Sequence, residues 1–454
     1  MLYFDNLSRD TADAYLADGL TEDVITRLGH VQRLIVKSRS AVQRVRKAAT
    51  RGPAVLGQEL GVAHLVTGSV RRMGSGVRVT VELVRVTDGV HVWGEQYDRR
   101  DADVLAIEDE IARAVATAIA GRLAPPERQA LARRPSRSIR AYDHFLRGNY
   151  YLAQRTARAV VLAVDQYGTA VRLDPEFTEA WARFAFAVGL SLARNWEWPG
   201  LSQDSVLARG LAAEARALAL DSGSAEGWIA RGILSNPAGR GSAETKAAYE
   251  RALALDSTNA EAWNVYGNLL LGMGSDSLAR VALERAVALD PYRAISLATL
   301  SWLEFLERRD TRALRWADSS LAVDPAFAHG YEHRAEIRAY LGHLGTARAD
   351  AEHAARLGGG PASRAVLAIV ETLAGDTAAA REQLATVDPV RDVDSHLWTV
   401  TALVVVGERD RALAALARLP VGPDRLRTSL RNRGFDPLRN DPRFQRLVEE
   451  SQPR

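Results

Sequence analysis

Residues 260–293 read AEAWNVYGNLLLGMGSDSLARVALERAVALDPYR, a unit of 34 residues. It matches the spacing W-x2-L-G-x2-Y, then A-x3-F and a terminal Pro, through Trp263, Tyr266, Gly267, Leu270, Ala279, Leu283 and Pro291. Large residues at these positions fill the gap between two helices, whereas the small Gly267 and Ala279 let the two backbones approach. Pro291 ends the second helix because it cannot donate the next hydrogen bond. The stretch therefore predicts a helix–turn–helix unit.

This spacing is the signature of the tetratricopeptide repeat (TPR), whose helix pair cannot bury its apolar face alone and stacks on further copies. The motif Glu-x-Trp recurs at residues 179–181, 226–228 and 261–263. An aspartate followed by Pro or Ser ends the units, at Asp174, Asp221, Asp256, Asp290, Asp324 and Asp388. From Asp221 the next intervals are 35, 34 and 34 residues. We therefore expect an all-α TPR solenoid, a right-handed superhelix of helix pairs.

The composition indicates a folded protein with more than one core. The chain has 454 residues, of which 47% are hydrophobic and 25% are charged, and chains of this length usually divide into several cores. Its net charge of +3 is small, and only three of its 59 basic residues are lysines. Because cysteine is absent, disulfides, thiol catalysis and Cys-based zinc sites are excluded. No apolar run approaches the ~20 residues that span a bilayer.

Residues 1–124 lack the repeat and predict a small α/β domain. Val77, Val79 and Val81 alternate with polar residues, as in a strand with one buried face. We expect strands at residues 2–4, 34–36, 64–72, 77–85 and 90–97, and helices near residues 16–28, 53–60 and 103–123.

Shifts in composition divide the rest of the chain into three parts. Residues 125–140 begin with two prolines and carry a basic run, which indicates a linker. Residues 141–424 hold about seven or eight repeats, and the last two are degenerate. Residues 425–454 are expected to form a polar-faced cap that closes the solenoid.

Three stretches of the α/β domain resemble the TolB-amino-terminal-like (FlgO-like) domain, which precedes a TPR array in many bacterial proteins. They are DGLTED at residues 18–23, GSVRR at residues 68–72 and HVWGEQYDR at residues 91–99. The segment LRNDPRF at residues 438–444 is similar to one that often closes those arrays. The resemblance covers nearly the whole chain.

In that family the two modules often follow a serine/threonine kinase, an adenylate cyclase or a winged-helix DNA-binding domain, and the sequence contains none of these. The resemblance implies an accessory region of a signalling protein and brings no catalytic residues. The first strand is short relative to the family pattern, so we expect Met1 to mark the edge of a fragment. As written the chain is expected to be cytoplasmic, but extracytoplasmic if its parent is a membrane kinase.

The first helix of each TPR unit lines a concave groove, to which positions 2, 5, 9 and 12 of the unit should point. The predicted partner-binding residues are Phe186, Ile233, Asn264, Asn268, Trp302, Phe305, Glu332 and Glu336. Asn264 and Asn268 should share one exposed face and hydrogen-bond a peptide backbone, with Trp302 and Phe305 as an apolar anchor beside them.

A basic stretch and a histidine cluster are the other candidate sites. Residues 24–58 hold eight basic residues and no acidic one, which indicates either a solvated face or an anion-binding surface. The candidate anion-binding residues are Arg33, Lys37, Arg39, Arg44, Arg46 and Lys47. His329 and His333 are four residues apart, but HGYEH departs from the zinc motif H-E-x-x-H, so we expect surface or packing roles.

No phosphate-binding glycine loop, nucleophile elbow or kinase motif is present. We therefore expect a non-catalytic scaffold of a bacterial signalling protein, without a metal or cofactor, that binds a protein segment in the TPR groove. The alternatives are the effector region of a DNA-binding regulator and direct nucleic-acid binding through residues 27–51.

Overall fold

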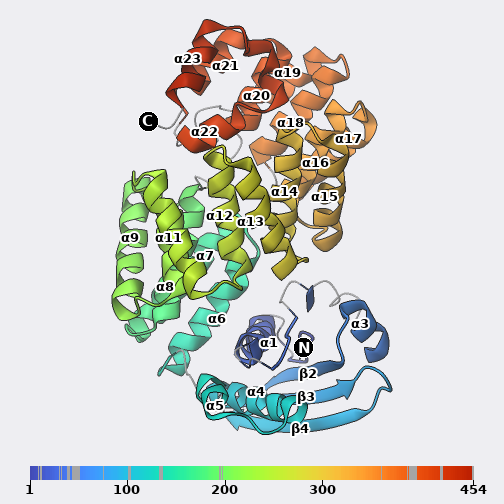
Figure 1. Ribbon diagram of the computed structural model, residues 1–454, viewed down its shortest axis with the longest axis vertical. Helices are drawn as coiled ribbons and strands as arrows, with labels where there is room; N and C mark the ends of the chain where they lie inside the picture. Colours follow the sequence, from blue (N-terminus) through green and yellow to red (C-terminus); the bar gives the residue numbers. More distant parts are fainter. Residues whose placement is uncertain are drawn as a thin grey trace. The chain divides into compact units, whose positions relative to one another are not determined.

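The computed structural model describes residues 1–8, 10, 13–29, 31, 33–37, 41–42, 52–74, 76–100, 104–131, 136–193, 196, 198–358, 360–385, 387, 396–419 and 423–451. These residues form a small α/β domain followed by a TPR solenoid (Figure 1). The chain divides into two compact units. Unit 1 comprises Met1–Ser191 and Trp198–Ala230, and unit 2 comprises Leu192–Glu197 and Arg231–Arg454.

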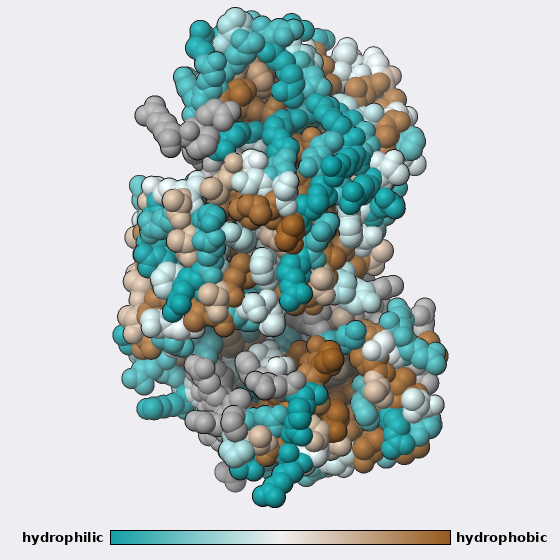
Figure 2. Space-filling view, viewed as in Figure 1, coloured by the Kyte–Doolittle hydropathy of each residue, from teal (hydrophilic) through white to brown (hydrophobic). Residues whose placement is uncertain are grey.

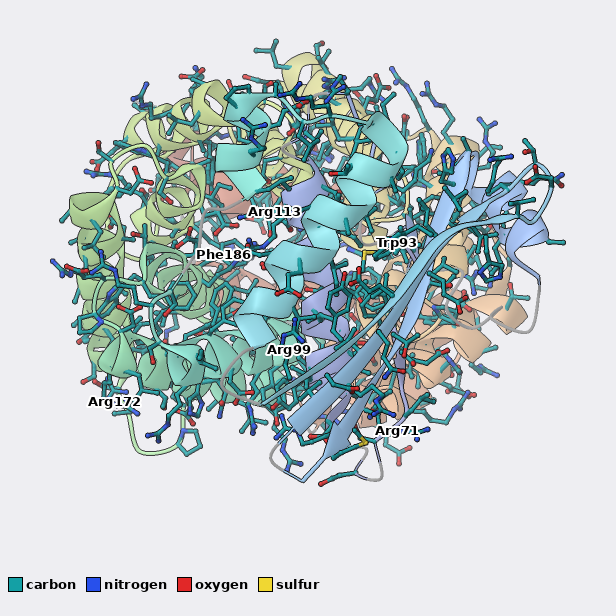
Figure 3. The ribbon with its side chains drawn as sticks, turned by 90° about the horizontal axis from the view of Figure 1, so that it is seen from below. Arg71, Trp93, Arg99, Arg113, Arg172 and Phe186 are labelled. Carbon is teal, nitrogen blue, oxygen red and sulfur yellow. The ribbon has the colours of Figure 1, made fainter. Side chains whose placement is uncertain are left out.

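Unit 1 begins with a sheet of strand order β1-β2-β3-β4, in which β1 runs parallel to β2 and the later pairs are antiparallel. The strands are β1 (Asp5–Asn6), β2 (His64–Met73), β3 (Gly76–Arg85) and β4 (His91–Arg100). The helices of this domain are α1 (Ala14–Gly29), α3 (Pro53–Leu60), α4 (Val104–Ala120) and α5 (Pro125–Leu131). Figure 3 shows α4 lying along one face of the sheet, where Val79 and Val81 are fully buried.

The sequence predicted most of these elements correctly. The three long strands and the helices at α1, α3 and α4 are confirmed within a few residues. The predicted strand at residues 34–36 is wrong, because no strand forms there and Ile35 is 94% exposed. The first strand is Asp5–Asn6 rather than residues 2–4, although the amide of Leu2 donates to the carbonyl of Val66, 2.7 Å away.

After the sheet the chain is built of consecutive helix pairs, in which we name the first helix A and the second helix B. Unit 1 contains α6 (Ile139–Ala153), α7 (Ala157–Leu173), α8 (Thr178–Ala193) and α9 (Gln203–Leu220), and α10 (Ala225–Ser235) crosses into unit 2. Unit 2 continues with α11 (Ser242–Leu255), α12 (Ala260–Gly272), α13 (Asp276–Leu289), α14 (Ala294–Leu306), α15 (Asp310–Val323), α16 (Ala328–Tyr340), α17 (Leu344–Arg356), α18 (Gly360–Leu373) and α19 (Thr377–Ala385). It ends with α20 (His396–Val406), α21 (Arg409–Leu416), α22 (Pro423–Ser429), the 3-10 helix η4 (Arg433–Leu438) and α23 (Pro442–Glu450).

The recurrent aspartates are the residues that join one pair to the next. Asp388 lies outside the described residues. Each of the other five ends a B helix, and its carboxylate accepts a hydrogen bond from the amide two residues later, which fixes a tight turn. These bonds run to Asp174, Asp221, Asp256, Asp290 and Asp324 from Glu176, Gly223, Thr258, Tyr292 and Ala326. The aspartate therefore repeats because every unit needs the same turn.

The recurrent tryptophans connect that turn to the following A helix through a hydrogen bond. The indole N–H of Trp181 donates to the carbonyl of Pro175 at 3.1 Å. Trp228 and Trp263 donate in the same way to Ser222 and Ser257, at 3.0 and 2.9 Å. Packing alone would explain a large residue here, whereas these bonds explain why the residue is tryptophan.

A buried charged cluster joins the α/β domain to the first TPR helix within unit 1. The guanidinium of Arg27 contacts Asp109 and donates to the carboxylate of Asp23 at 2.8 Å. The hydroxyl of Tyr142 on α6 donates to Glu108 at 2.9 Å, and Glu108 is fully buried. Burial raises the pKa of Glu108 well above its usual value. The α/β domain and the first helix pair are thus held by specific side chains rather than by a bare linker.

Within the described ranges, no helix combines the length and the apolar character that crossing a membrane requires.

Close helix packing in the first pair depends on Gly148. A Cβ at this position would lie 2.4 Å from the ring of the buried Tyr167. We therefore expect Gly148→Ala to destabilise unit 1 by about 1–3 kcal/mol, measured by urea unfolding followed by circular dichroism.

Gly168→Ala, on the partner helix α7, is the matched control. Its Cβ would meet only the side chain of Arg172, at 3.6 Å, so helix propensity predicts no loss and a gain of up to ~1 kcal/mol. Equal unfolding midpoints for the two variants would contradict this account of the packing.

Candidate functional site

The eight residues predicted for the groove lie on A helices, but most of them are covered. Phe186 (Figure 3), Asn264, Phe305, Glu332 and Glu336 are at most 5% exposed. Ile233 and Trp302 are half-buried, and Asn268 is exposed. Their assignment as partner-binding residues stays a prediction. Within unit 2 we call the side of α12, α14 and α16 that carries Asn268, Trp302, Phe305, Glu332 and Glu336 the A-helix face.

The chain's own C-terminal segment, residues 428–438, lies against part of this face. The side-chain amide of Asn432 donates to the carboxylate of Glu336 at 2.7 Å. The guanidinium of Arg433 lies 4.6 Å from the ring centre of Phe305 and 5.2 Å from that of Tyr340. Two of the predicted groove residues therefore contact a segment that the sequence had placed only at the end of the solenoid.

Ion pairs hold the same segment to two consecutive helix pairs. Arg431 donates to Asp276 at 2.8 Å, and Arg433 donates to Asp310 at 3.0 Å. Arg308 in turn donates to both oxygens of Asp436 at 2.9 Å. In addition, the hydroxyl of Thr428 donates to the carbonyl of Leu271, at the end of α12. The segment is thus fixed along the turns that join A helices to B helices, 123 to 157 residues away in sequence.

The two acceptors Asp276 and Asp310 are equivalent residues of successive repeats. They are 34 residues apart, and each is the first residue of a B helix. A carboxylate in the first turn is favoured by the helix dipole. Two successive repeats therefore present equivalent carboxylates, which the alternate residues Arg431 and Arg433 contact.

Glu336 is the buried polar centre of the contact. It is completely buried, and it accepts hydrogen bonds from Asn432 and from the indole N–H of Trp398, both at 2.7 Å. Burial raises the pKa of Glu336, while the two donors and the nearby Arg433 act in the opposite direction. Because Asn432 is one of the two donors, the hydrogen bonds of this buried carboxylate are complete only when the segment is in place.

The paired histidines pack against α20. Their Nε2 atoms are 3.1 Å apart, and the rings of His329 and His333 lie 5.2 and 5.1 Å from Trp398. This agrees with the packing role expected from the sequence. In the described part of the chain, no three His, Asp or Glu side chains form a metal-binding group.

Asn264 and Asn268 do not form the exposed pair that the sequence predicted. Asn268 is exposed, and its amide donates to the backbone carbonyl of Asn264 at 3.1 Å. Asn264 is only 5% exposed, and within the described residues its Oδ1 has no hydrogen-bond partner. The prediction of exposure is therefore right for Asn268 and wrong for Asn264, because helical spacing does not reveal which neighbour covers a side chain.

Of the candidate anion-binding residues, the structure describes two. Arg33 donates to Glu127 at 2.8 Å and to the carbonyls of Ala120 and Arg122, so it closes the end of α4. Lys37 is half-buried. The others, Arg39, Arg44, Arg46 and Lys47, lie outside the described residues. Anion binding by this stretch stays a prediction.

Comparison with known proteins gives one relative in sequence. No protein-family model matches the chain. A Rhizobium meliloti protein named “Putative adenylate cyclase 3” is 33% identical over 216 residues, which are 47% of this chain and 36% of that protein. The chain thus spans little more than a third of this relative's length.

Several solved structures resemble parts of the chain. PilF of Pseudomonas aeruginosa is 19% identical and matches 46% of this chain and 90% of its own, with a TM-score of 0.37. Yeast Tom70 is 16% identical and matches 68% of this chain and 67% of its own, with a TM-score of 0.42. YrrB, a TPR protein with an unusual peptide-binding site, is 22% identical and matches 42% of this chain and 91% of its own, with a TM-score of 0.28. The TPR assignment rests on the helix pairs of this chain and the turns that join them.

Arg433 is expected to contribute more to the stability of unit 2 than a more exposed arginine nearby. Its side chain is 12% exposed and contacts both Asp310 and the ring of Phe305. Arg433→Ala should lower the free energy of unfolding by about 1–3 kcal/mol, measured by denaturant unfolding.

The control is Arg443→Ala. Arg443 is 50% exposed and pairs with the carboxylates of Asp410 and Asp441. Exposed pairs contribute little, so the loss should stay below ~1 kcal/mol. A smaller loss for Arg433→Ala than for Arg443→Ala would contradict the docking described above.

Proposed function

We propose that this chain is the protein-binding module of a bacterial signalling protein, and that its A-helix face holds a segment of a partner. The observation that carries the proposal is the C-terminal segment, which already lies on this face. A surface that holds one segment through ion pairs, a hydrogen bond from a side-chain amide and a cation–π contact has the chemistry to hold another.

The open part of the A-helix face is the part we assign to the partner. Asn268 is exposed and Trp302 is half-buried, packed against Phe305 at 5.6 Å and His333 at 5.1 Å between ring centres. An amide that can pair with a peptide backbone, near a fixed aromatic ring, is a common arrangement in protein interfaces.

The α/β domain is proposed to be a docking or sensing domain of the TolB-amino-terminal-like type. Its attachment to α6 supports this role, because Tyr15 donates to Asp143 at 2.6 Å and Arg147 donates to Tyr15 at 2.9 Å. A signal that changed the α/β domain would thus act directly on side chains of the first helix pair.

The signalling context is supported by the partial likeness to the Rhizobium meliloti protein. We propose that this chain serves such a protein as an accessory region. The activity in that protein's name is not assigned to the residues described here.

The test uses a peptide library displayed on phage and selected against the whole chain. Peptides recovered on the wild type are expected to bind the variant Asn268→Arg at least ~10-fold more weakly, because the exposed amide is replaced by a bulky cation. Affinities are measured by fluorescence anisotropy, with helical content checked by circular dichroism.

The matched control is Val281→Arg. Val281 is 62% exposed on α13, the B helix of the same pair, and the substitution adds the same charge. Equal affinity of the recovered peptides for both variants would remove the assignment to the A-helix face.

A further inference from the structure

We propose that the C-terminal segment is an internal ligand at the edge of the A-helix face, and that the partner bound at the open part of this face continues, with the same Arg-x-Arg chemistry, into the place of the segment and displaces it. This inference rests on the proposed function and names its partner class and its regulation.

The first argument is the position of the contacts. The segment touches residues of three consecutive helix pairs, through Leu271 and Asp276, then Asp310, then Glu336. A segment that only capped the solenoid would cover the last pair. This one extends back along the turns that join A helices to B helices, beside the face that TPR units present to ligands.

The second argument is the division of the segment into a polar half and an apolar anchor. In the polar half, residues 428–433, Asn432 donates to Glu336 on that face. Hydrogen bonds and ion pairs also hold this half to the adjoining turns, at Leu271, Asp276 and Asp310. The anchor is formed by Phe435 and Leu438, which are fully buried in a core cluster with residues such as Trp398 and Leu403. The polar half could therefore leave the face while the anchor keeps the chain end in place.

The ion pairs are reachable from solvent. The side chains of Arg431 and Asp276 are 31% and 24% exposed, and those of Arg433 and Asp310 are 12% and 22% exposed. In Figure 2 the surface over α14 and α15 is mostly hydrophilic. Partly hydrated ion pairs exchange partners more readily than a dry apolar interface, because water can replace each contact as it breaks.

The chemistry of the pockets defines the partner. Two carboxylates one repeat apart accept arginines two residues apart, and the rings of Phe305 and Tyr340 lie within reach of the second guanidinium. The side-chain amide of Asn432, which lies between the two arginines in sequence, donates a hydrogen bond to the carboxylate of Glu336. The expected ligand is therefore a protein segment with Arg-x-Arg around a hydrogen-bond donor. Arginine is required because lysine cannot make the bidentate contact.

The experiment supplies the segment in trans. A labelled peptide of residues 424–438, DRLRTSLRNRGFDPL, is titrated into the full-length wild type and into the variant Arg431→Ala/Arg433→Ala. We expect at least 10-fold tighter binding to the variant, because in the wild type the tethered copy competes at an effective concentration on the order of millimolar. Adding Asp276→Asn and Asp310→Asn to the same variant should abolish this gain in affinity for the peptide.

Two controls accompany the titration. The variant Arg439→Ala/Arg443→Ala removes the same charge from positions that are about half exposed, and should bind the peptide as weakly as the wild type. A peptide in which alanine replaces both Arg431 and Arg433 should not bind the variant Arg431→Ala/Arg433→Ala, which we call the released variant. If Arg431→Ala/Arg433→Ala loses helical content, Arg431→Lys/Arg433→Lys replaces it, since lysine keeps the charge without the bidentate pairing.

Equal affinity of the peptide for the wild type and the released variant would overturn the inference. The proposed function would survive that result if phage-selected peptides still bound through Asn268. Failure of those peptides to respond to Asn268→Arg would instead overturn the proposed function, whatever the C-terminal peptide does.

Discussion

The ion pairs of Arg431 and Arg433 are the contacts on which the organisation of unit 2 depends. They connect the end of the chain to Asp276 and Asp310, which begin successive B helices. A repeat protein normally stabilises each unit only through its neighbours. Here a distant segment adds contacts that cross several units, so the stability of these repeats depends on a part of the chain outside the repeat pattern.

The same contacts bear on function, because they are made beside the face that we assign to partners. Glu336 needs two hydrogen-bond donors in its buried position, and Asn432 provides one of them. Removing the segment leaves that carboxylate with an unfilled acceptor, which costs free energy unless another donor arrives. Exchange of one segment for another of like chemistry keeps every buried group satisfied.

The sequence predicted the fold well and the site only in part, for a physical reason. Repeat spacing reports the contacts that every unit makes, so the turn at Asp290 and the helix around Trp263 could be read directly. It does not report a contact made once, such as that of Arg433 with Asp310. The equivalent aspartates Asp276 and Asp310 and the sequence Arg-Asn-Arg were visible signals, but only the folded chain brings them together. Asn264 was misjudged for a related reason, since its position in the helix says nothing about what covers it.

The most direct test of this account is amide hydrogen exchange of the wild-type chain, followed by mass spectrometry. In the docked segment the amide of Gly434 donates to the side chain of Asn432 and that of Phe435 to its backbone carbonyl, at 2.8 and 3.0 Å. The account predicts that residues 428–438 are protected for minutes or longer, comparably with α12 and α16. Exchange of these amides within seconds, while α12 and α16 stay protected, would show that the segment does not lie on the A-helix face and would contradict the account.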